Sequence, residues 1–165
     1  MGTELHHHRA RLVVRAAGGA GGPGLAGVLQ ADGTRAPFAD ASIDRVLLDA
    51  PCTGLGALRR RPEARWRRTP ADLDDLVALQ RALLVEAMRV LRPGGALLYA
   101  TCSPVLSETA SVVAEATERP DIRLDDVLAC LPGVADAAGP LPGTAQLWPH
   151  RHGTDAMFLA LLRKE

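Results

Sequence analysis

Two cysteines and an aspartate have the types and spacing that covalent chemistry needs. Asp49 lies three residues before Cys52 in the run DAPCTGLG, and Cys102 lies in the short run TCS. A thiolate that adds to an electron-poor ring carbon forms a covalent intermediate and activates the neighbouring carbon. A carboxyl group relieves the charge that this addition creates on a ring nitrogen, by hydrogen bonding or by proton donation. The three residues therefore predict a covalent catalytic site.

A structural role is the alternative for each cysteine, because a buried cysteine is more often a small core residue than a nucleophile. Two cysteines at the ends of adjacent predicted strands favour the catalytic interpretation. Cys130, in a region rich in proline and glycine, is predicted to be structural. With three cysteines and no C-x-x-C pair, the sequence favours neither a secreted disulfide framework nor a metal site.

The elements that would position these residues alternate between strands and helices. Strands are predicted at residues 28–29, 43–48, 96–99 and 156–162, and helices at residues 4–17, from residue 69 to the Pro-Gly-Gly at 93–95, and at 107–119. This alternation predicts a mostly parallel α/β sheet in one domain that spans residues 1–165. Ligands of such sheets bind beyond the carboxyl ends of the strands. Four candidate residues are predicted at such ends: Asp32, Asp49, Cys52 and Cys102.

The region that begins at Thr69 carries the clearest helix signals. Thr69 is a favourable N-cap, Pro70 suits the first helical position, and acidic residues follow in the first turn. Apolar residues then recur at helical spacing as far as Leu91.

The composition fits one domain with a core of small and branched apolar residues. The 165 residues are 47% hydrophobic but only 3% aromatic, and the formal net charge is zero. The charge of the whole molecule therefore gives no attraction to nucleic acid. No apolar run reaches the length of a membrane span and residues 1–15 lack a signal-peptide core, so we expect a cytoplasmic protein.

Four stretches carry a family resemblance. They are DAPCTGLG at residues 49–56, RRRPEARW at 59–66, LQRALLVEAMRVLRPGGALLYATCS at 79–103 and WPHRHGTDAMFLALL at 148–162. The chain resembles the Sun/Nol1/Nop2 family of RNA (cytosine-5) methyltransferases, and most of all its bacterial ribosomal RNA members. The resemblance implies a Rossmann-like sheet with helices on both faces, S-adenosylmethionine as methyl donor, and RNA, ribosomal RNA in particular, as substrate.

The resemblance also implies a role for each candidate residue. Cys102 would attack carbon 6 of cytosine, and Cys52 would help to resolve the covalent adduct. Asp49 would contact the ring-nitrogen edge of the base and lie beside the methyl donor. Asp32 would lie near the adenine of the donor, and Glu4 would hold the hydroxyls of its ribose, as a carboxylate at a strand end does in dinucleotide sites.

The chain departs from the family pattern in its first residues. The strand and glycine loop that bind the donor should precede Glu4, where this sequence begins. The glycine-rich run at residues 18–24 follows a predicted helix rather than a strand, so we predict a flexible loop there. We therefore expect marginal stability and weak donor binding, and the alternative function is a non-catalytic RNA-binding remnant. An amino-group methyltransferase would need an Asn- or Asp-Pro-Pro-aromatic turn in place of DAPC.

An arginine-rich segment follows the first cysteine. Six arginines lie within ten residues, with one tryptophan among them: Arg59, Arg60, Arg61, Arg65, Trp66, Arg67 and Arg68. Guanidinium groups bind phosphate and an aromatic ring stacks on bases, so Arg59, Arg60, Arg61, Arg65 and Trp66 are predicted to contact RNA. The alternative is a solvated charged loop.

Polar residues near the last predicted strand, and one glutamate after the second cysteine, are predicted to have structural roles. His150, His152 and Asp155 are predicted to form a turn before the last strand, since no nucleophile neighbours them. Glu108 is predicted to serve the positive end of a helix.

Overall fold

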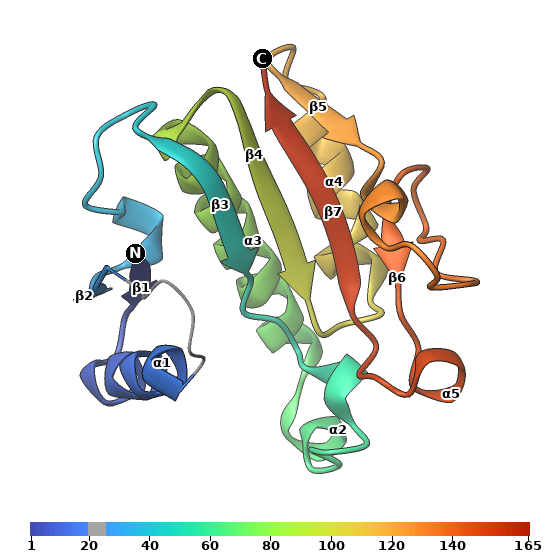
Figure 1. Ribbon diagram of the computed structural model, residues 1–165. Helices are drawn as coiled ribbons and strands as arrows, with labels where there is room; N and C mark the ends of the chain where they lie inside the picture. The colour runs from blue at the N-terminus through green and yellow to red at the C-terminus, as the bar shows by residue number, and fades with distance from the viewer. Residues whose placement is uncertain (20–25) are drawn as a thin grey trace. The chain divides into compact units, whose positions relative to one another are not determined.

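The computed structural model describes residues 1–19 and 26–165 (Figure 1). The described residues form two compact units, Met1–Ala39 and Asp40–Glu165. Most of the predicted glycine loop at residues 18–24 lies outside the described residues, although α1 extends through Gly18 to Gly19. The prediction of a single domain stays a prediction.

The first unit is a pair of short parallel strands with one helix. Strand β1 (Gly2–Glu4) pairs with β2 (Val28–Gln30), and Glu4 lies opposite Gln30. Helix α1 (His7–Gly19) packs on both strands. The prediction that the helix begins at Glu4 is wrong. A three-residue strand is too short to show an alternating pattern, and the Glu4 carboxylate instead accepts from the backbone N–H of His6.

The second unit contains a five-stranded sheet in the order β3-β4-β7-β5, with β6 paired to β7. The strands are β3 (Ile43–Asp49), β4 (Leu91–Thr101), β5 (Ile122–Asp125), β6 (Ala145–Gln146) and β7 (Phe158–Lys164). Strand β3 is parallel to β4, whereas β7 is antiparallel to β4, β5 and β6. Strands β3, β4, β5 and β6 therefore run in the same direction, as the prediction of a mostly parallel sheet requires, and β7 runs in the opposite direction. Because β7 is reversed, its first residue, Phe158, pairs with the last residue of β4, Thr101.

Helix α3 (Pro70–Val90) begins as the sequence predicted. The Thr69 hydroxyl accepts from the backbone N–H of Asp72, and the Asp72 carboxylate accepts from the backbone N–H of Thr69, which forms a capping box. The helix ends at Val90, before the Pro-Gly-Gly that was expected to stop it. That tripeptide lies in an irregular part of β4, where the register shifts between the first pairs of β3 and β4.

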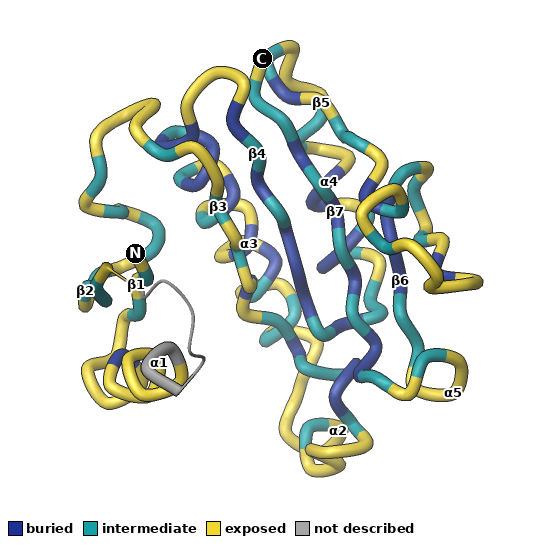
Figure 2. The backbone as a smooth tube through the Cα atoms, in the orientation of Figure 1, coloured by how far each residue is buried: buried dark blue, intermediate teal, exposed yellow. Residues whose placement is uncertain are grey.

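Both long helices of this unit cover the same face of the sheet (Figure 1). The segment predicted as a helix at residues 107–119 divides into the 3₁₀ turn η3 (Leu106–Glu108) and helix α4 (Ala110–Thr117), and α4 packs beside α3. Strands β4 and β7 carry buried residues along the centre of the sheet (Figure 2), and the side chains of Leu97, Tyr99, Phe158 and Leu162 are fully buried. No helix among the described residues is long and apolar enough to cross a membrane.

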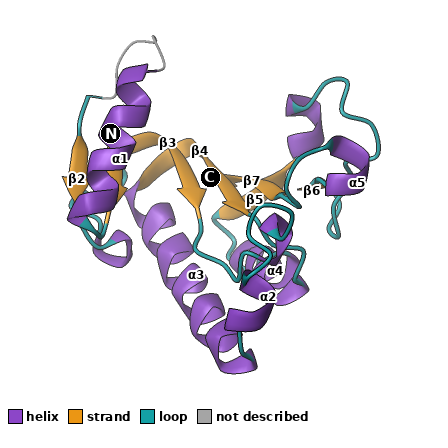
Figure 3. Ribbon diagram, turned by 90° about the horizontal axis from the view of Figure 1, so that it is seen from below, coloured by secondary structure: helices purple, strands orange, loops and turns teal. Residues whose placement is uncertain are grey.

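Short elements lie near the edge where β3 and β4 end, the edge seen from below in Figure 3. They are the 3₁₀ turn η2 (Leu55–Ala57), helix α2 (Ala64–Arg67) and helix α5 (Pro149–His152). A further 3₁₀ turn, η4 (Val127–Cys130), ends at an exposed Cys130. Helix α5 is the single turn predicted before the last strand. The loops beside η2 and α2 carry Cys52 and most of the arginine-rich segment.

Candidate active site

The two cysteines predicted to act together lie side by side. Asp49 ends β3 and pairs with Ala100 in β4, so the residues that follow each strand leave the sheet at the same edge. The Sγ atoms of Cys52 and Cys102 are 3.4 Å apart, within hydrogen-bond distance for sulfur. The sequence-based expectation that they converge is confirmed by this distance.

The contact between the thiols moves their two pKa values in opposite directions. A hydrogen bond from the Cys52 thiol lowers the pKa of Cys102 to about 7, against the opposing effects of burial and of the negative charge on Asp49. The same contact, with burial, raises the pKa of Cys52 far above its usual range. Because the thiolate is the nucleophilic form of cysteine, Cys102 is the better nucleophile of the two. Cys52 therefore keeps its proton, and its S–H group is the donor of the hydrogen bond to the Cys102 sulfur.

Gly56 connects the turn after Cys52 to the residues that follow β4 and precede β7. Its N–H donates to the carbonyl oxygen of Cys102 at 2.9 Å, and its own carbonyl accepts from the N–H of Ala156 at 2.8 Å. A Cβ atom at this position would lie 2.2 Å from the Ala156 oxygen and 2.7 Å from the Cys102 oxygen. Only glycine allows this approach, so DAPCTGLG requires its last glycine for packing.

A buried glutamate links the two cysteine turns, and the sequence analysis missed it. The interpretation of Glu108 as a residue that serves a helix dipole is wrong, because its side chain is fully buried and accepts hydrogen bonds from other segments. The donors belong to Thr53, Ser103 and Gln80. Thr53 follows Cys52 and Ser103 follows Cys102, so one carboxylate contacts both turns. No local pattern marks a contact between residues 55 positions apart.

The arginine-rich segment contains two arginines that bind Asp155 and other side chains that face solvent. Arg59 and Arg60 both bind Asp155, which is 8% exposed, and Arg60 Nε lies 3.0 Å from its Oδ2. Their hydrogen bonds, those of Arg60 first, lower the pKa of Asp155. Arg61 and Arg65 are exposed and form no ion pair with any residue in the described ranges. Trp66 is 82% exposed, and the Arg65 guanidinium lies 6.0 Å from its ring centre.

Of the three residues predicted on the donor side, Glu4 and Asp32 lie in the first unit, whereas Asp49 lies in the second. Glu4 ends β1, and Asp32 follows the end of the parallel neighbour β2. Both carboxylates have spare accepting capacity. Glu4 accepts from the backbone N–H of His6 through Oε1 and lies 3.6 Å from Arg9 through Oε2. Asp32 accepts twice from Thr34 through Oδ1 alone. Acidic side chains at the ends of adjacent parallel strands fit the hydroxyls of a nucleoside.

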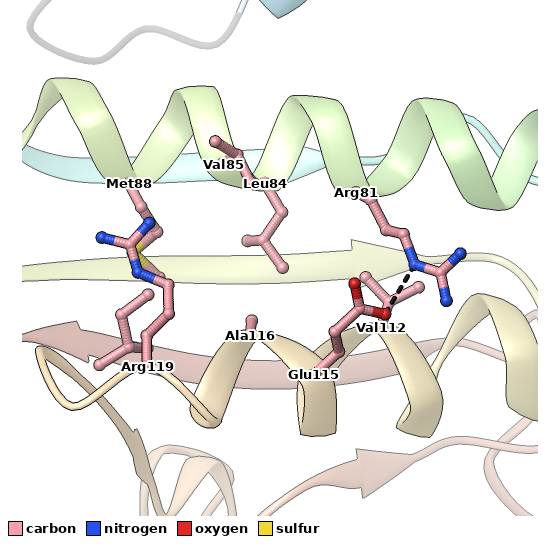
Figure 4. A pocket seen from close by; sticks show the side chains of 9 residues that line it. Arg81, Leu84, Val85, Met88, Val112, Glu115, Ala116 and Arg119 are labelled. Atoms are coloured by element: carbon pink, nitrogen blue, oxygen red, sulfur yellow. Dashed lines mark hydrogen bonds and ion pairs between the residues drawn. The ribbon is translucent and has the colours of Figure 1, made fainter.

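A groove between α3 and α4 lies away from this chemistry (Figure 4). Its volume is about 210 Å³, and the lining includes Leu84, Met88 and Val112, while Arg81 and Glu115 form an ion pair across it. It contains none of the predicted site residues. We assign it to imperfect packing between the two helices.

Comparison with known proteins decides the family. The family described as 16S rRNA methyltransferase RsmB/F matches residues 1–163. The chain belongs to this family. The resemblance drawn from its motifs is thereby confirmed, and this RsmB/F-family chain has the Rossmann-like α/β fold of S-adenosylmethionine-dependent methyltransferases.

Individual relatives agree with this assignment. A protein of Mycobacterium tuberculosis described only as a methyltransferase is 56% identical over 137 residues, which are 83% of this chain and 30% of that protein. Ribosomal RNA small subunit methyltransferase B of Pasteurella multocida is 39% identical over 73% of this chain and 26% of its own length. The crystal structure of NSun6 from Pyrococcus horikoshii with SFG has a TM-score of 0.79 at 26% identity, over 98% of this chain and 40% of that one. The chain thus spans well under half the length of each of these relatives.

Proposed function

We propose that this site transfers a methyl group from S-adenosylmethionine to carbon 5 of cytosine in RNA, with ribosomal RNA as the substrate. The observation that carries the proposal is the pair of thiols 3.4 Å apart. The hydrogen bond from Cys52 lowers the pKa of Cys102, which favours its thiolate. A cytosine ring needs a nucleophile at carbon 6 before carbon 5 can accept a methyl group. The family and the ribosomal RNA enzyme of Pasteurella support RNA as the substrate.

Cys102 carries the covalent step. Its thiolate forms a bond to carbon 6, and the electron pair of the ring double bond moves to carbon 5. The donor supplies an electrophilic methyl group at which carbon 5 forms its new bond, and the methyl–sulfur bond breaks. A base then removes the proton on carbon 5, the double bond re-forms, and the bond between carbon 6 and Cys102 breaks. The thiolate is regenerated and the product is 5-methylcytosine.

Cys52 and Asp49 assist these steps. Cys52 retains its proton beside Cys102, so it is placed to exchange a proton with the departing sulfur when the adduct is resolved. Asp49 is exposed at the end of β3, where its carboxyl group can bind the ring-nitrogen edge of the base. Glu4 and Asp32 would hold the ribose and the region of the adenine of the donor.

The exposed part of the arginine-rich segment supplies the RNA contact. Arg61 and Arg65 offer guanidinium groups to phosphate, and Trp66 offers a ring for base stacking. Arg59 and Arg60 also belong to this surface, since their side chains remain 50% and 60% exposed while they hold Asp155.

The proposal is tested by identifying the product. The chain is incubated with ribosomal RNA and S-adenosylmethionine that carries an isotopic methyl label, and the RNA is digested to nucleosides for mass spectrometry. We expect label in 5-methylcytidine, and Cys102→Ala is expected to lower its formation by about 10³-fold or more. Label in another nucleoside would contradict the proposal. RNA binding without methyl transfer would favour the alternative, a non-catalytic RNA-binding segment.

A further inference from the structure

The carboxylate of Glu108 is a hub of hydrogen bonds inside the second unit. Oε1 accepts from the backbone N–H of Thr53 at 2.7 Å and from Gln80 Nε2 at 3.1 Å. Oε2 accepts from the hydroxyls of Thr53 and Ser103, both at 2.6 Å. Every partner is a donor, which suits a carboxylate because its oxygens only accept. Glu108 itself is 0% exposed.

The partners of Glu108 show what the hub holds. Thr53 is the residue after Cys52, and Ser103 is the residue after Cys102, so a single carboxylate fixes the chain directly beyond each thiol. Gln80 extends the hub to helix α3 and also donates to the carbonyl of Pro51, the residue before Cys52. The turn that contains Cys52 is therefore held on both sides of the cysteine.

The backbone of Glu108 is anchored as well. Its carbonyl oxygen accepts from the hydroxyl of Tyr99 at 2.9 Å, which fixes η3 to the centre of β4. The Ser103 hydroxyl also accepts from the N–H of Val105, which closes the turn between Cys102 and η3. A buried network whose donors are satisfied rigidifies its surroundings.

We propose that Glu108 is a positioning residue for the methyl transfer, and that its carboxylate holds the two cysteine turns at the separation where the Cys52 thiol donates to the Cys102 sulfur. This inference rests on the proposed function for its chemical meaning. Glu108 hydrogen-bonds Thr53 and Ser103 rather than either thiol. Its negative charge also favours the protonated form of Cys52. Loss of the carboxylate removes the acceptor of four buried hydrogen bonds and lets the two turns move independently.

The test measures the acidity of Cys102 without RNA or methyl donor. The rate of Cys102 alkylation by iodoacetamide is followed across pH by peptide mass spectrometry, with the exposed Cys130 as an internal reference for the reagent. In the unaltered chain, alkylation rises with pH through a midpoint near the pKa of about 7, because only the thiolate reacts. Glu108→Ala is expected to raise this midpoint by about one unit or more, toward the value of an ordinary cysteine.

Two variants separate positioning from general loss of stability. Ile122→Ala removes a buried side chain at the far end of the sheet and is expected to lower the melting temperature while the midpoint stays unchanged. Glu108→Gln keeps the shape and one accepting oxygen, so its midpoint should fall between those of the unaltered chain and Glu108→Ala. If Glu108→Ala does not fold, Ser103→Ala decides, since it removes one donor from the hub and is expected to raise the midpoint by a smaller amount.

An unchanged midpoint in folded Glu108→Ala, or in Ser103→Ala where the first variant does not fold, would overturn the inference. So would an equal shift in Ile122→Ala, because the effect would then follow stability alone. If Glu108→Ala raises the alkylation midpoint of Cys102 but the unaltered chain forms no 5-methylcytidine, the positioning role stands and the proposed function is contradicted. Formation of 5-methylcytidine with an unchanged midpoint would count against the inference alone.

Discussion

The turn that carries Cys52 and the arginine-rich segment that follows it are adjacent in sequence but built in opposite ways. In the turn, Thr53 is buried, and the backbone is tied to Glu108, to Cys102 and to Ala156. In the segment, Trp66 is 82% exposed, and α2 is a single helical turn without buried residues. The turn is fixed by hydrogen bonds to residues far away in the sequence, whereas the segment presents its side chains to solvent.

This difference matches the demands of the two proposed tasks. Covalent attack requires the nucleophile to be held close to its productive geometry, which a buried hydrogen-bond network provides. Contact with the phosphate backbone is electrostatic and tolerates adjustable side chains. Arg60 has a feature of each region, because its side chain is largely exposed and its guanidinium group is bound by Asp155.

The largest expected effect comes from breaking the fixed region at Gly56. Gly56→Ala places a methyl group 2.2 Å from the Ala156 oxygen and 2.7 Å from the Cys102 oxygen, so one of these backbones must move. We expect the free energy of unfolding to fall by about 1–3 kcal/mol or more, measured by urea denaturation. Gly27→Ala is the matched control, because nothing lies within 4 Å of its added methyl group. Equal stability of Gly56→Ala and the unaltered chain would show that the turn is not fixed in this way.

A smaller effect is expected from the exposed region, where RNA affinity rather than stability should change. Arg61→Ala with Arg65→Ala removes two guanidinium groups that have no ion-pair partner among the described residues. Each phosphate contact to a single strand adds about 0.7 to the magnitude of the slope of log affinity against log salt concentration, so loss of two contacts should lower that magnitude by about 1.4. Fluorescence anisotropy with labelled RNA at several salt concentrations measures it.

Arg60→Ala sharpens the same comparison. Its guanidinium is already engaged by Asp155, so we expect a smaller change in the salt slope than in the double variant. Arg81→Ala, on helix α3 and paired with Glu115, is the control for loss of a surface arginine. A salt slope that falls as much in Arg81→Ala as in the double variant would remove the assignment of RNA contact to this segment.

The sequence predicted those parts of the molecule that have local signals. The cap at Thr69, the strand before Asp49 and the placement of both cysteines at strand ends follow from residue types and short-range patterns. The family motifs also located the tail that contains Asp155. The strand β5 (Ile122–Asp125) was not predicted, because four residues beside a helix end give too short an alternation.

The rest of the site depends on contacts between residues far apart in the chain. Glu108 lies 55 positions from Thr53, and Asp155 lies 95 positions from Arg60. The close approach at Gly56 exists only because β7 runs antiparallel and returns Ala156 to the end of β4. A buried glutamate and a packing glycine look like surface residues in one sequence, so only the assembled structure reveals their roles.

In the proposed mechanism, Cys102 forms the covalent bond to the base and Cys52 helps to break it. The most direct measurement uses RNA that contains 5-fluorocytosine, with S-adenosylmethionine, and asks for a protein–RNA complex that survives denaturing electrophoresis. Fluorine at carbon 5 blocks the last deprotonation, so the unaltered chain should accumulate the complex and Cys102→Ala should form none. With ordinary RNA, Cys52→Ala should retain a complex that the unaltered chain releases. A complex that persists in Cys102→Ala, or that depends on Cys52 instead, would contradict the account.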